Sequence, residues 1–176
     1  MRYLLHIFLT LIIIGLAAWL YYIISEPVRV THRLEHIDAR VKERMDYIAA
    51  AEIAYKSAHG KYTDNWYFLV DFAKNGKLPV VKSTTSTDTS YVSVTDTTFI
   101  SARDSLFPAG YAIDSLPFVP YAKDGLRFVI ELSVVETGSN SVPVFQITDT
   151  RPPHLRMRDP YTWGSLSEVK YGGSWE

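Results

Sequence analysis

The feature that most constrains this chain is an unbroken apolar stretch at residues 4–24, LLHIFLTLIIIGLAAWLYYII, which contains no aspartate, glutamate, lysine or arginine. A helix of this length is about 30 Å long at about 1.5 Å per residue, which matches the hydrocarbon thickness of a bilayer. From Pro27 onward the composition is that of a water-soluble domain. We therefore predict a membrane anchor at residues 1–27, followed by a folded part in water.

The length and the end of this stretch distinguish a retained membrane anchor from a cleaved export signal. A signal has an apolar region of about 7 to 15 residues that closes on small side chains. The stretch here is longer, and it ends in bulky rings that suit the membrane interface. The side chains expected to contact lipid are spaced along the span, at Leu4, Phe8, Ile12, Leu16, Trp19 and Tyr22.

Composition excludes several classes of function. The 176 residues include 18 Lys+Arg and 19 Asp+Glu, so the formal net charge is -1 and we expect no nucleic-acid partner. The absence of cysteine excludes disulfides, thiolate nucleophiles and cysteine-based zinc sites. The 12 Tyr, 8 Phe and 4 Trp provide apolar surface for one core, so residues 61–176 are predicted to form a single head.

After Pro27, apolar residues recur at helical spacing, at Val30, Leu34, Ile37, Val41, Met45, Ile48 and Tyr55. One such stripe predicts an amphipathic stalk helix over residues 28–60 that packs on the head and ends at Gly60. Pro27 is compatible with a new helix or with a kink in one continuous helix. Glu52 also falls on the stripe, where a nearby basic side chain is its expected partner. A short coiled-coil seam, and hence self-association, is the alternative use of the stripe.

The first part of the head combines a short helix with weak strand signals. Asp64 is a good N-cap for a helix over residues 65–75, which Gly76 would end. Val80 and Val81 indicate a strand, and a second weak strand is expected at residues 91–94. Between them, the Ser/Thr/Asp-rich run at residues 83–90 is interpreted as a surface segment.

Stronger strand signals follow in the second half of the head. Residues 116–121 and 126–135 are predicted to form a hairpin around an Asp-Gly turn, and residues 142–148 a third strand. Phe128, Ile130, Leu132 and Val134 alternate with more polar residues, which indicates one buried face. Pro143 is expected to place its strand at the sheet edge. The predicted fold class is α+β, with the stalk helix packed on a small antiparallel meander.

The tail from residue 151 onward is rich in proline and contains Trp163 and Trp175. Large aromatic side chains are mostly buried, so these rings are expected to pack against the head. The alternative is an exposed partner surface, because tryptophans also concentrate in protein interfaces.

The sharpest catalytic pattern is His32-Arg33-Leu34-Glu35-His36, which has the form of the H-x-x-E-H zinc motif. Its histidines lie opposite the apolar stripe, and no third ligand follows at a fixed spacing, so we interpret the segment as a solvated helix face. Three acidic residues could chelate calcium, but they do not follow an EF-hand pattern. They are Asp149, Asp159 and Glu168. The sequence therefore predicts no catalytic residue, metal site or cofactor.

Residues 51–69, AEIAYKSAHGKYTDNWYFL, resemble the end of the N-terminal helix of type IV pilins and type II secretion pseudopilins. In those families an apolar span runs into an amphipathic helix, an A-x-x-x-Y, G-x-Y and leucine pattern, and then an antiparallel sheet. Tyr55, Gly60, Tyr62 and Leu69 fill the pattern here. Those families also carry a glutamate near the start of the mature span, whereas this span has none.

Nearly the full length also resembles a set of uncharacterised single-span membrane proteins of Bacteroidetes bacteria. The resemblance lies in four segments, Glu26-Pro27-Val28, AYKSAHGKYT at residues 54–63, FVPY at residues 118–121, and an ending with GSL at residues 164–166 and GSWE at residues 173–176. It implies an inner-membrane protein with a periplasmic, pilin-like head and no assigned activity.

Membrane orientation receives conflicting signals. One arginine precedes the span, and several basic residues follow it, at Arg29, Arg33, Arg40, Lys42 and Arg44. Counted alone, these charges favour a cytoplasmic head, but they alternate with acidic residues and long domains translocate largely regardless of charge. Because of the resemblance, we expect the head to be periplasmic.

The function expected from these features is a non-enzymatic, pilin-like component of an envelope or secretion assembly that acts through protein contacts. The alternative is a membrane-tethered domain that binds a glycan, lipid or peptide ligand.

Overall fold

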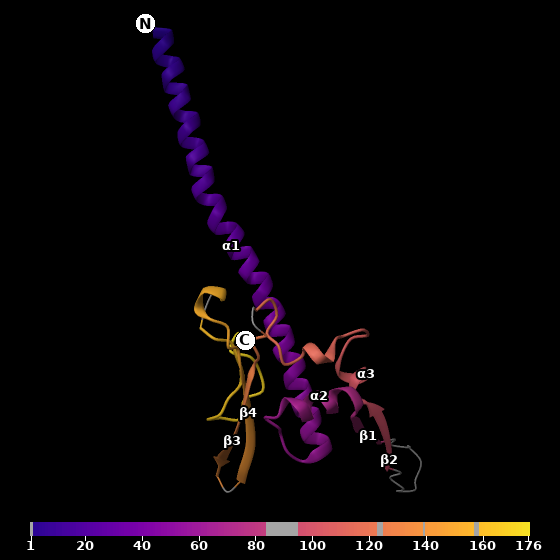
Figure 1. The fold of residues 1–176 in the computed structure, drawn as a ribbon. Helices are drawn as coiled ribbons and strands as arrows, with labels where there is room; N and C mark the ends of the chain where they lie inside the picture. The colour runs from indigo at the N-terminus through magenta and orange to yellow at the C-terminus, as the bar shows by residue number, and fades with distance from the viewer. Residues whose placement is uncertain (1, 84–94, 123–124, 139, 157–158) are drawn as a thin grey trace, which may run out of the picture.

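The computed structural model describes residues 2–83, 95–122, 125–138, 140–156 and 159–176. It has an α+β fold in which a long N-terminal helix, α1 (Arg2–His59), meets a head with two small antiparallel sheets (Figure 1). The coarse fold class predicted from the sequence is therefore confirmed.

Helix α1 is continuous from the apolar stretch to the head. Pro27 lies inside it, so the alternative of a separate second helix is wrong. The helix ends where the sequence predicts, because Gly60 adopts a left-handed φ of 79° and its N–H donates to the carbonyl of Lys56 at 2.7 Å.

The N-terminal part of α1, Arg2–Ile23, is long and apolar enough to cross a membrane, with a mean hydropathy of 2.3. None of its most apolar window is buried against the rest of the protein. The side chains assigned to lipid contact are all exposed here, at Leu4, Phe8, Ile12, Leu16, Trp19 and Tyr22.

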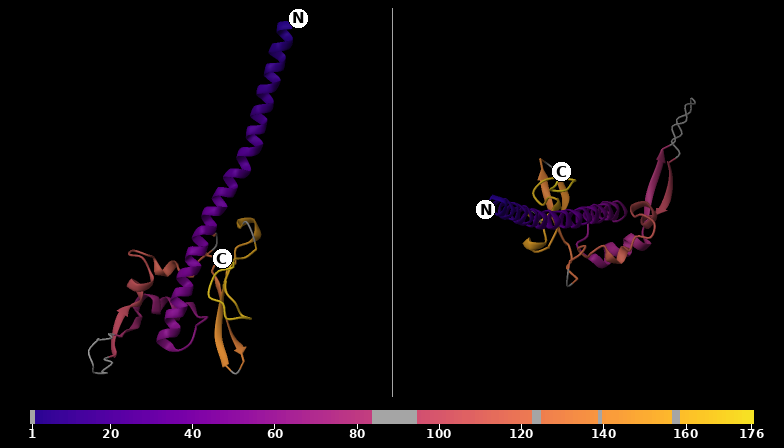
Figure 2. Two further views of the ribbon diagram at one scale, coloured as in Figure 1. Left: turned by 180° about the vertical axis from the view of Figure 1, so that it is seen from behind. Right: turned by 90° about the horizontal axis from the view of Figure 1, so that it is seen from above.

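The C-terminal part of α1 runs between two groups of elements (Figures 1 and 2). The three-stranded sheet and the C-terminal tail lie on one side, and α2, α3 and the two-stranded sheet lie on the other. One face of this part is buried, at Val41, Met45, Ile48, Ala49, Ala51, Ala54 and Tyr55. From Val41 to Tyr55 the apolar stripe read from the sequence thus faces the head, as predicted, whereas the side chain of Val30 lies outside the described ones.

Helix α2 (Trp66–Asn75) is capped one residue later than predicted. Asn65, not Asp64, is the N-cap, because its backbone is extended and its side chain accepts a hydrogen bond from the N–H of Tyr67 at 2.9 Å. Aspartate and asparagine are similarly good caps, so the residue type could not choose between adjacent positions. Leu69 and Phe72 of α2 are buried in the core.

The two-stranded sheet pairs β1 (Lys77–Ser83) with β2 (Thr95–Ser101). Val80 and Val81 lie in β1, as the sequence indicated, whereas β2 was not predicted. The surface segment and weak strand expected over residues 83–94 lie, beyond Ser83, outside the described residues. Helix α3 (Ala102–Leu106) follows β2 directly, and Ala102 is buried.

The three-stranded sheet has the order β3-β4-β5 and is antiparallel throughout. Its strands are β3 (Val129–Thr137), β4 (Asn140–Thr148) and β5 (Thr162–Gly164). The predicted strand at residues 116–121 is wrong, because the tail supplies the third strand instead. Pro117 and Pro120 explain the difference, since neither has an N–H to donate to a ladder. Among the described residues this segment makes isolated bridge contacts, including a hydrogen bond from the N–H of Val119 to the carbonyl of Leu126 at 2.8 Å.

Pro143 lies in the central strand of this sheet, which corrects the predicted edge position. The strand β5 pairs only with Gln146–Thr148, so β4 has a neighbour on one side alone at Pro143. The proline is therefore tolerated where its missing donor would face an open side.

The core face of β3 is buried over only half its length. Ile130 is 7% exposed and Phe128, just before the strand, is 1% exposed, whereas Leu132 and Val134 are 41% and 61% exposed. The predicted alternation therefore ends early. It does so because the far end of the β3–β4 hairpin extends past the elements that cover its near end (Figure 1).

Candidate functional site

A buried ionic cluster joins α1 to the tail. Arg151 is 2% exposed, and its Nη2 lies 2.8 Å from Asp38 Oδ1 on α1 and 2.8 Å from Asp149 Oδ2 at the end of β4. Its Nε also donates to Asp149 Oδ2 at 2.9 Å, and its Nη1 donates to the carbonyl of Leu155 at 3.1 Å. Burial lowers the pKa of Arg151, but the two carboxylates more than offset this and the net direction is upward. Arg151 thus remains charged and binds both segments.

Two aromatic side chains of the tail, Tyr161 and Trp175, pack beside this ionic cluster. The Tyr161 hydroxyl donates to Asp38 Oδ2 at 2.9 Å, and the Tyr161 ring meets the Trp175 ring edge-on at 5.7 Å. Lys42 of α1 places its Nζ 4.7 Å from the centre of the Tyr161 ring and 5.7 Å from that of Trp175. Trp175 is therefore half-buried and already covered in part by a cation of the same chain.

Trp163 is a core residue. It is 8% exposed, stacks on Phe145 with ring centres 5.3 Å apart, and donates its indole N–H to Asp46 Oδ1 at 3.1 Å. Of the two uses considered for this ring, packing against the head is the one that the structure shows. The alternative interpretation of Trp163 as an exposed partner surface is wrong, because β5 carries the ring onto the sheet and α1 supplies its hydrogen-bond acceptor.

Glu52 is fully buried in the stripe of α1. Its Oε2 accepts a hydrogen bond from the backbone N–H of Thr63 at 3.1 Å, and its Oε1 has no hydrogen-bond partner among the described residues. The prediction of a basic partner for Glu52 is wrong, since no ion pair to Glu52 forms among the residues that the structure describes. Burial raises the pKa of Glu52 to about 8, and the Thr63 hydrogen bond opposes the rise. The carboxyl group is therefore mostly neutral at pH 7.

The pilin-like pattern residues lie where α1 turns into the head. Tyr55 and Tyr62 are buried, and Tyr62 meets Phe145 of β4 with ring centres 4.7 Å apart. Leu69 is fully buried in α2, and Gly60 provides the turn between the two helices. These residues thus connect α1 to both sides of the head, which is a structural role.

The histidine motif lies on the exposed side of α1. His32 Nδ1 is 3.2 Å from Glu35 Oε2, and the His36 ring lies edge-on to Tyr121 at 6.0 Å. Asp149 belongs to the ionic cluster, whereas Asp159 and Glu168 are exposed. The residues that the structure describes include no group of three or more His, Asp or Glu side chains arranged to hold a metal ion.

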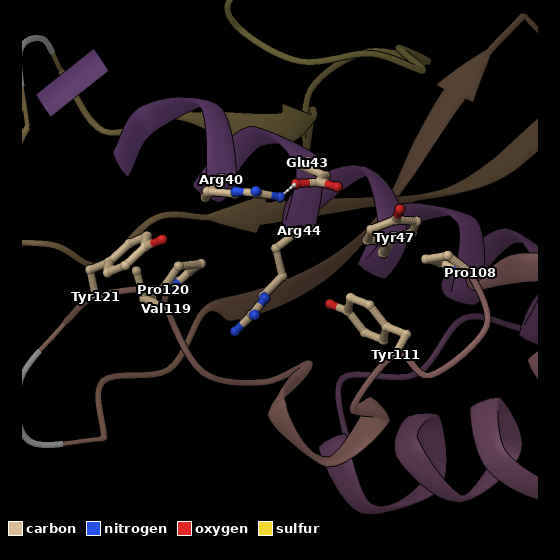
Figure 3. Close-up of a pocket in the computed structure, with 9 residues that line it drawn as sticks. All are labelled: Arg40, Glu43, Arg44, Tyr47, Pro108, Tyr111, Val119, Pro120 and Tyr121. Atoms are coloured by element: carbon tan, nitrogen blue, oxygen red, sulfur yellow. Dashed lines mark hydrogen bonds and ion pairs between the residues drawn. The ribbon is translucent and has the colours of Figure 1, made fainter. Parts of the chain in front are cut away.

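A groove of about 560 Å³ runs along α1 next to the loop before β3 (Figure 3). Four α1 residues at helical spacing line it, at Arg40, Glu43, Arg44 and Tyr47. Arg40 and Glu43 form an exposed ion pair at 2.9 Å. The opposite wall comes from Pro108 and Tyr111 and from Val119, Pro120 and Tyr121. Tyr47 and Tyr111 thus lie at one end of the groove and Tyr121 lies at the other.

Arg44 lies in the middle of this groove. Its Nη1 donates to the carbonyls of Ser115 at 3.0 Å and Phe118 at 2.8 Å, and so holds the loop against α1. The Tyr111 hydroxyl faces the guanidinium but makes no hydrogen bond of good geometry among the described residues. Burial raises the pKa of Tyr111, and the positive charge of Arg44 opposes the rise. Arg44 and Tyr111 therefore form a polar centre between aromatic walls.

Comparison of the chain with protein-family models, with curated proteins and with solved structures found no match.

Sequence reasoning assigned no role to Asp38, Arg151, Arg44 or Tyr121. Helical spacing could have predicted a role for Asp38, because a rotation of 100° per residue places it at the edge of the apolar stripe. A carboxylate at that position needs a partner. No local pattern marks Arg151, because its partner on α1 is more than a hundred residues away. Arg44 and Tyr121 line the same groove only because the loop folds back onto α1.

Replacement of Arg151 tests the ionic cluster. Arg151→Met leaves two buried carboxylates without their cation, so the free energy of unfolding should fall by about 3 to 5 kcal/mol. The same substitution at the exposed Arg40 removes a surface ion pair and should change it by less than about 1 kcal/mol. Urea unfolding of the full chain in non-ionic detergent, followed by tryptophan fluorescence, measures both. Equal effects of the two substitutions would contradict the cluster's role.

Replacement of Glu52 tests its raised pKa. Between the unfolded value of 4.5 and the folded value of about 8, only the folded state keeps the proton. The free energy of unfolding should therefore fall as pH rises through this window, by up to about 1.4 kcal/mol per pH unit. Glu52→Gln should remove this part of the pH dependence, whereas the exposed Glu168→Gln should not. Parallel pH profiles for wild type and Glu52→Gln would refute the assignment.

Proposed function

We propose that this protein is a non-enzymatic, single-span membrane protein with a pilin-like head that acts through protein contacts in an envelope or secretion assembly. In this proposal the apolar part of α1 lies in the inner membrane and the head lies in the periplasm.

The observation that carries the proposal is the continuity of α1 from a membrane-length apolar segment into the core of the head. The same helix has exposed side chains in its apolar first part, such as Phe8 and Leu16, and buried ones at Val41, Met45 and Ile48. A rod of this kind holds the head at a set distance and orientation from the bilayer. Such an arrangement suits a protein that presents a surface to neighbours in the same membrane.

The far end of the β3–β4 hairpin offers a surface for these contacts. Leu132 and Val134 are exposed on its core face, and β3 is an edge strand of the sheet. Exposed apolar side chains beside an unpaired strand edge favour association with another chain.

Site-specific photo-crosslinking in intact cells tests the proposal. A photoreactive amino acid at Val134 should give a discrete adduct with another membrane or envelope protein, because this side chain is 61% exposed on the hairpin. The same amino acid at Asp104, an exposed polar position on α3, serves as the control and should give none. Recovery of the chain in the soluble fraction, or identical adduct patterns at the two positions, would contradict the proposal.

A further inference from the structure

We propose that the groove between α1 and the loop before β3 binds a sugar that carries a carboxylate, with Arg44 receiving the carboxylate and the exposed Tyr121 ring covering a face of the sugar. This inference goes beyond the proposed function and does not depend on it.

The first argument is the uncompensated charge of Arg44. The guanidinium has five N–H donors, and the two hydrogen bonds to Ser115 and Phe118 both use Nη1. Their acceptors are carbonyls, which carry no formal charge, and no carboxylate lies within ion-pair distance of Arg44 among the described residues. The Nε and Nη2 side of a guanidinium has the fork geometry that receives a carboxylate.

The second argument is the backbone of Tyr121. Its φ is 58°, and it is the one residue other than glycine with positive φ in the described parts of the chain. Pro120 precedes it, and the N–H of Ala122 donates to the carbonyl of Val119 at 3.3 Å, so Tyr121 occupies the position of a turn that glycine prefers. A bulky residue in this conformation costs on the order of 1 kcal/mol or more, and such residues cluster at binding sites.

The strained tyrosine also stays exposed. Tyr121 is 63% exposed and lies at the end of the groove opposite Tyr47 and Tyr111 (Figure 3). Its ring therefore adds little to the core in exchange for the backbone strain. A ligand in the groove would give the ring a surface to cover.

The shape and the rim of the groove indicate the class of ligand. Its volume of about 560 Å³ lies within the usual range for small-molecule sites. Arg40 and Glu43 at the rim offer both donors and acceptors, which matches hydroxyl groups that do both. The rings of Tyr47 and Tyr111 pack on each other and on Phe107, so the exposed ring of Tyr121 is the one that can cover the C–H face of a sugar ring. A peptide is less well matched, because the loop carbonyls of Ser115 and Phe118 that could pair with its backbone are already bonded to Arg44.

The test is isothermal titration calorimetry of the full chain in detergent with digalacturonate as the probe. Galactobiose, which lacks the carboxylates, should bind at least about tenfold more weakly, because it loses a charge-assisted hydrogen bond. Acetate, inorganic phosphate and trialanine test whether charge alone or a peptide carboxylate is sufficient, and each should bind more weakly than digalacturonate.

A glycine at position 121 separates ligand binding from folding. Tyr121→Gly relieves the backbone strain, so the melting temperature should stay the same or rise, while loss of the ring should weaken digalacturonate binding roughly five- to tenfold. Tyr67→Ala, at a 75% exposed tyrosine on α2, is the matched control and should leave binding unchanged. Arg44→Lys, which keeps the charge but loses the fork, should also weaken binding.

Several results would overturn the proposal. These are the absence of digalacturonate binding, equal or tighter binding of galactobiose, acetate, phosphate or trialanine, and unchanged binding by Tyr121→Gly. A clear fall in the melting temperature of Tyr121→Gly would show that the ring supports the fold, and would likewise count against it.

Discussion

Burial of one face of α1 between the two parts of the head is the interaction on which the other features depend. The stripe from Val41 to Tyr55 contributes fully buried side chains, and each buried methylene stabilises the fold by about 0.8 kcal/mol. The three-stranded sheet and the α2–β1–β2 group lie on opposite sides of this helix (Figure 2). Without α1, each group would expose an apolar face to water.

The buried polar contacts give this packing its register. Asp38 binds Arg151, Asp46 accepts from Trp163, and Glu52 accepts from Thr63. An apolar stripe alone could slide or rotate with little loss, whereas a displaced Asp38 or Arg151 would leave a buried charge without its partner. The tail therefore fixes the rotation of α1 and is part of the fold, although it has little regular structure of its own.

Local patterns in the sequence predicted α1, α2 and the general fold class, but they did not predict α3 or the strand order. The stripe, Gly60 and the β3–β4 turn act through near neighbours, so spacing and residue type were enough. The third strand depends on the tail returning to Gln146–Thr148, a contact between segments far apart in the chain. Likewise, the basic partner expected for Glu52 was wrong because a backbone donor from the loop after α1 takes its place.

The candidate groove could not be predicted from the sequence either, because its two walls come from segments far apart in the chain. Its α1 residues repeat at helical spacing and resemble an ordinary solvated face, and the opposite wall comes from a loop held by Arg44. Only the positive φ of Tyr121, which no pattern of residue types announces, marks this loop as unusual.

Because α1 is one continuous helix, it connects its apolar N-terminal part rigidly to the head. Residues 24–59 of α1 correspond to roughly 54 Å of helix beyond the segment that is long and apolar enough to cross a membrane, and the C-terminal part of this length lies inside the head. A continuous rod would pass any tilt of the apolar segment directly to the head, whereas a flexible linker would let the head move freely. The packing of α1 in the head is therefore the claim that matters most for function.

Native-state hydrogen exchange of the full chain in detergent tests this claim most directly. If α1 and the sheet form one core, the amides of residues 41–55 and those of residues 144–148 should exchange with the same free energy of opening, because neither can open without the other. If the sheet amides exchange at a much lower free energy while those of α1 stay protected, the helix stands apart from the head and the account is contradicted.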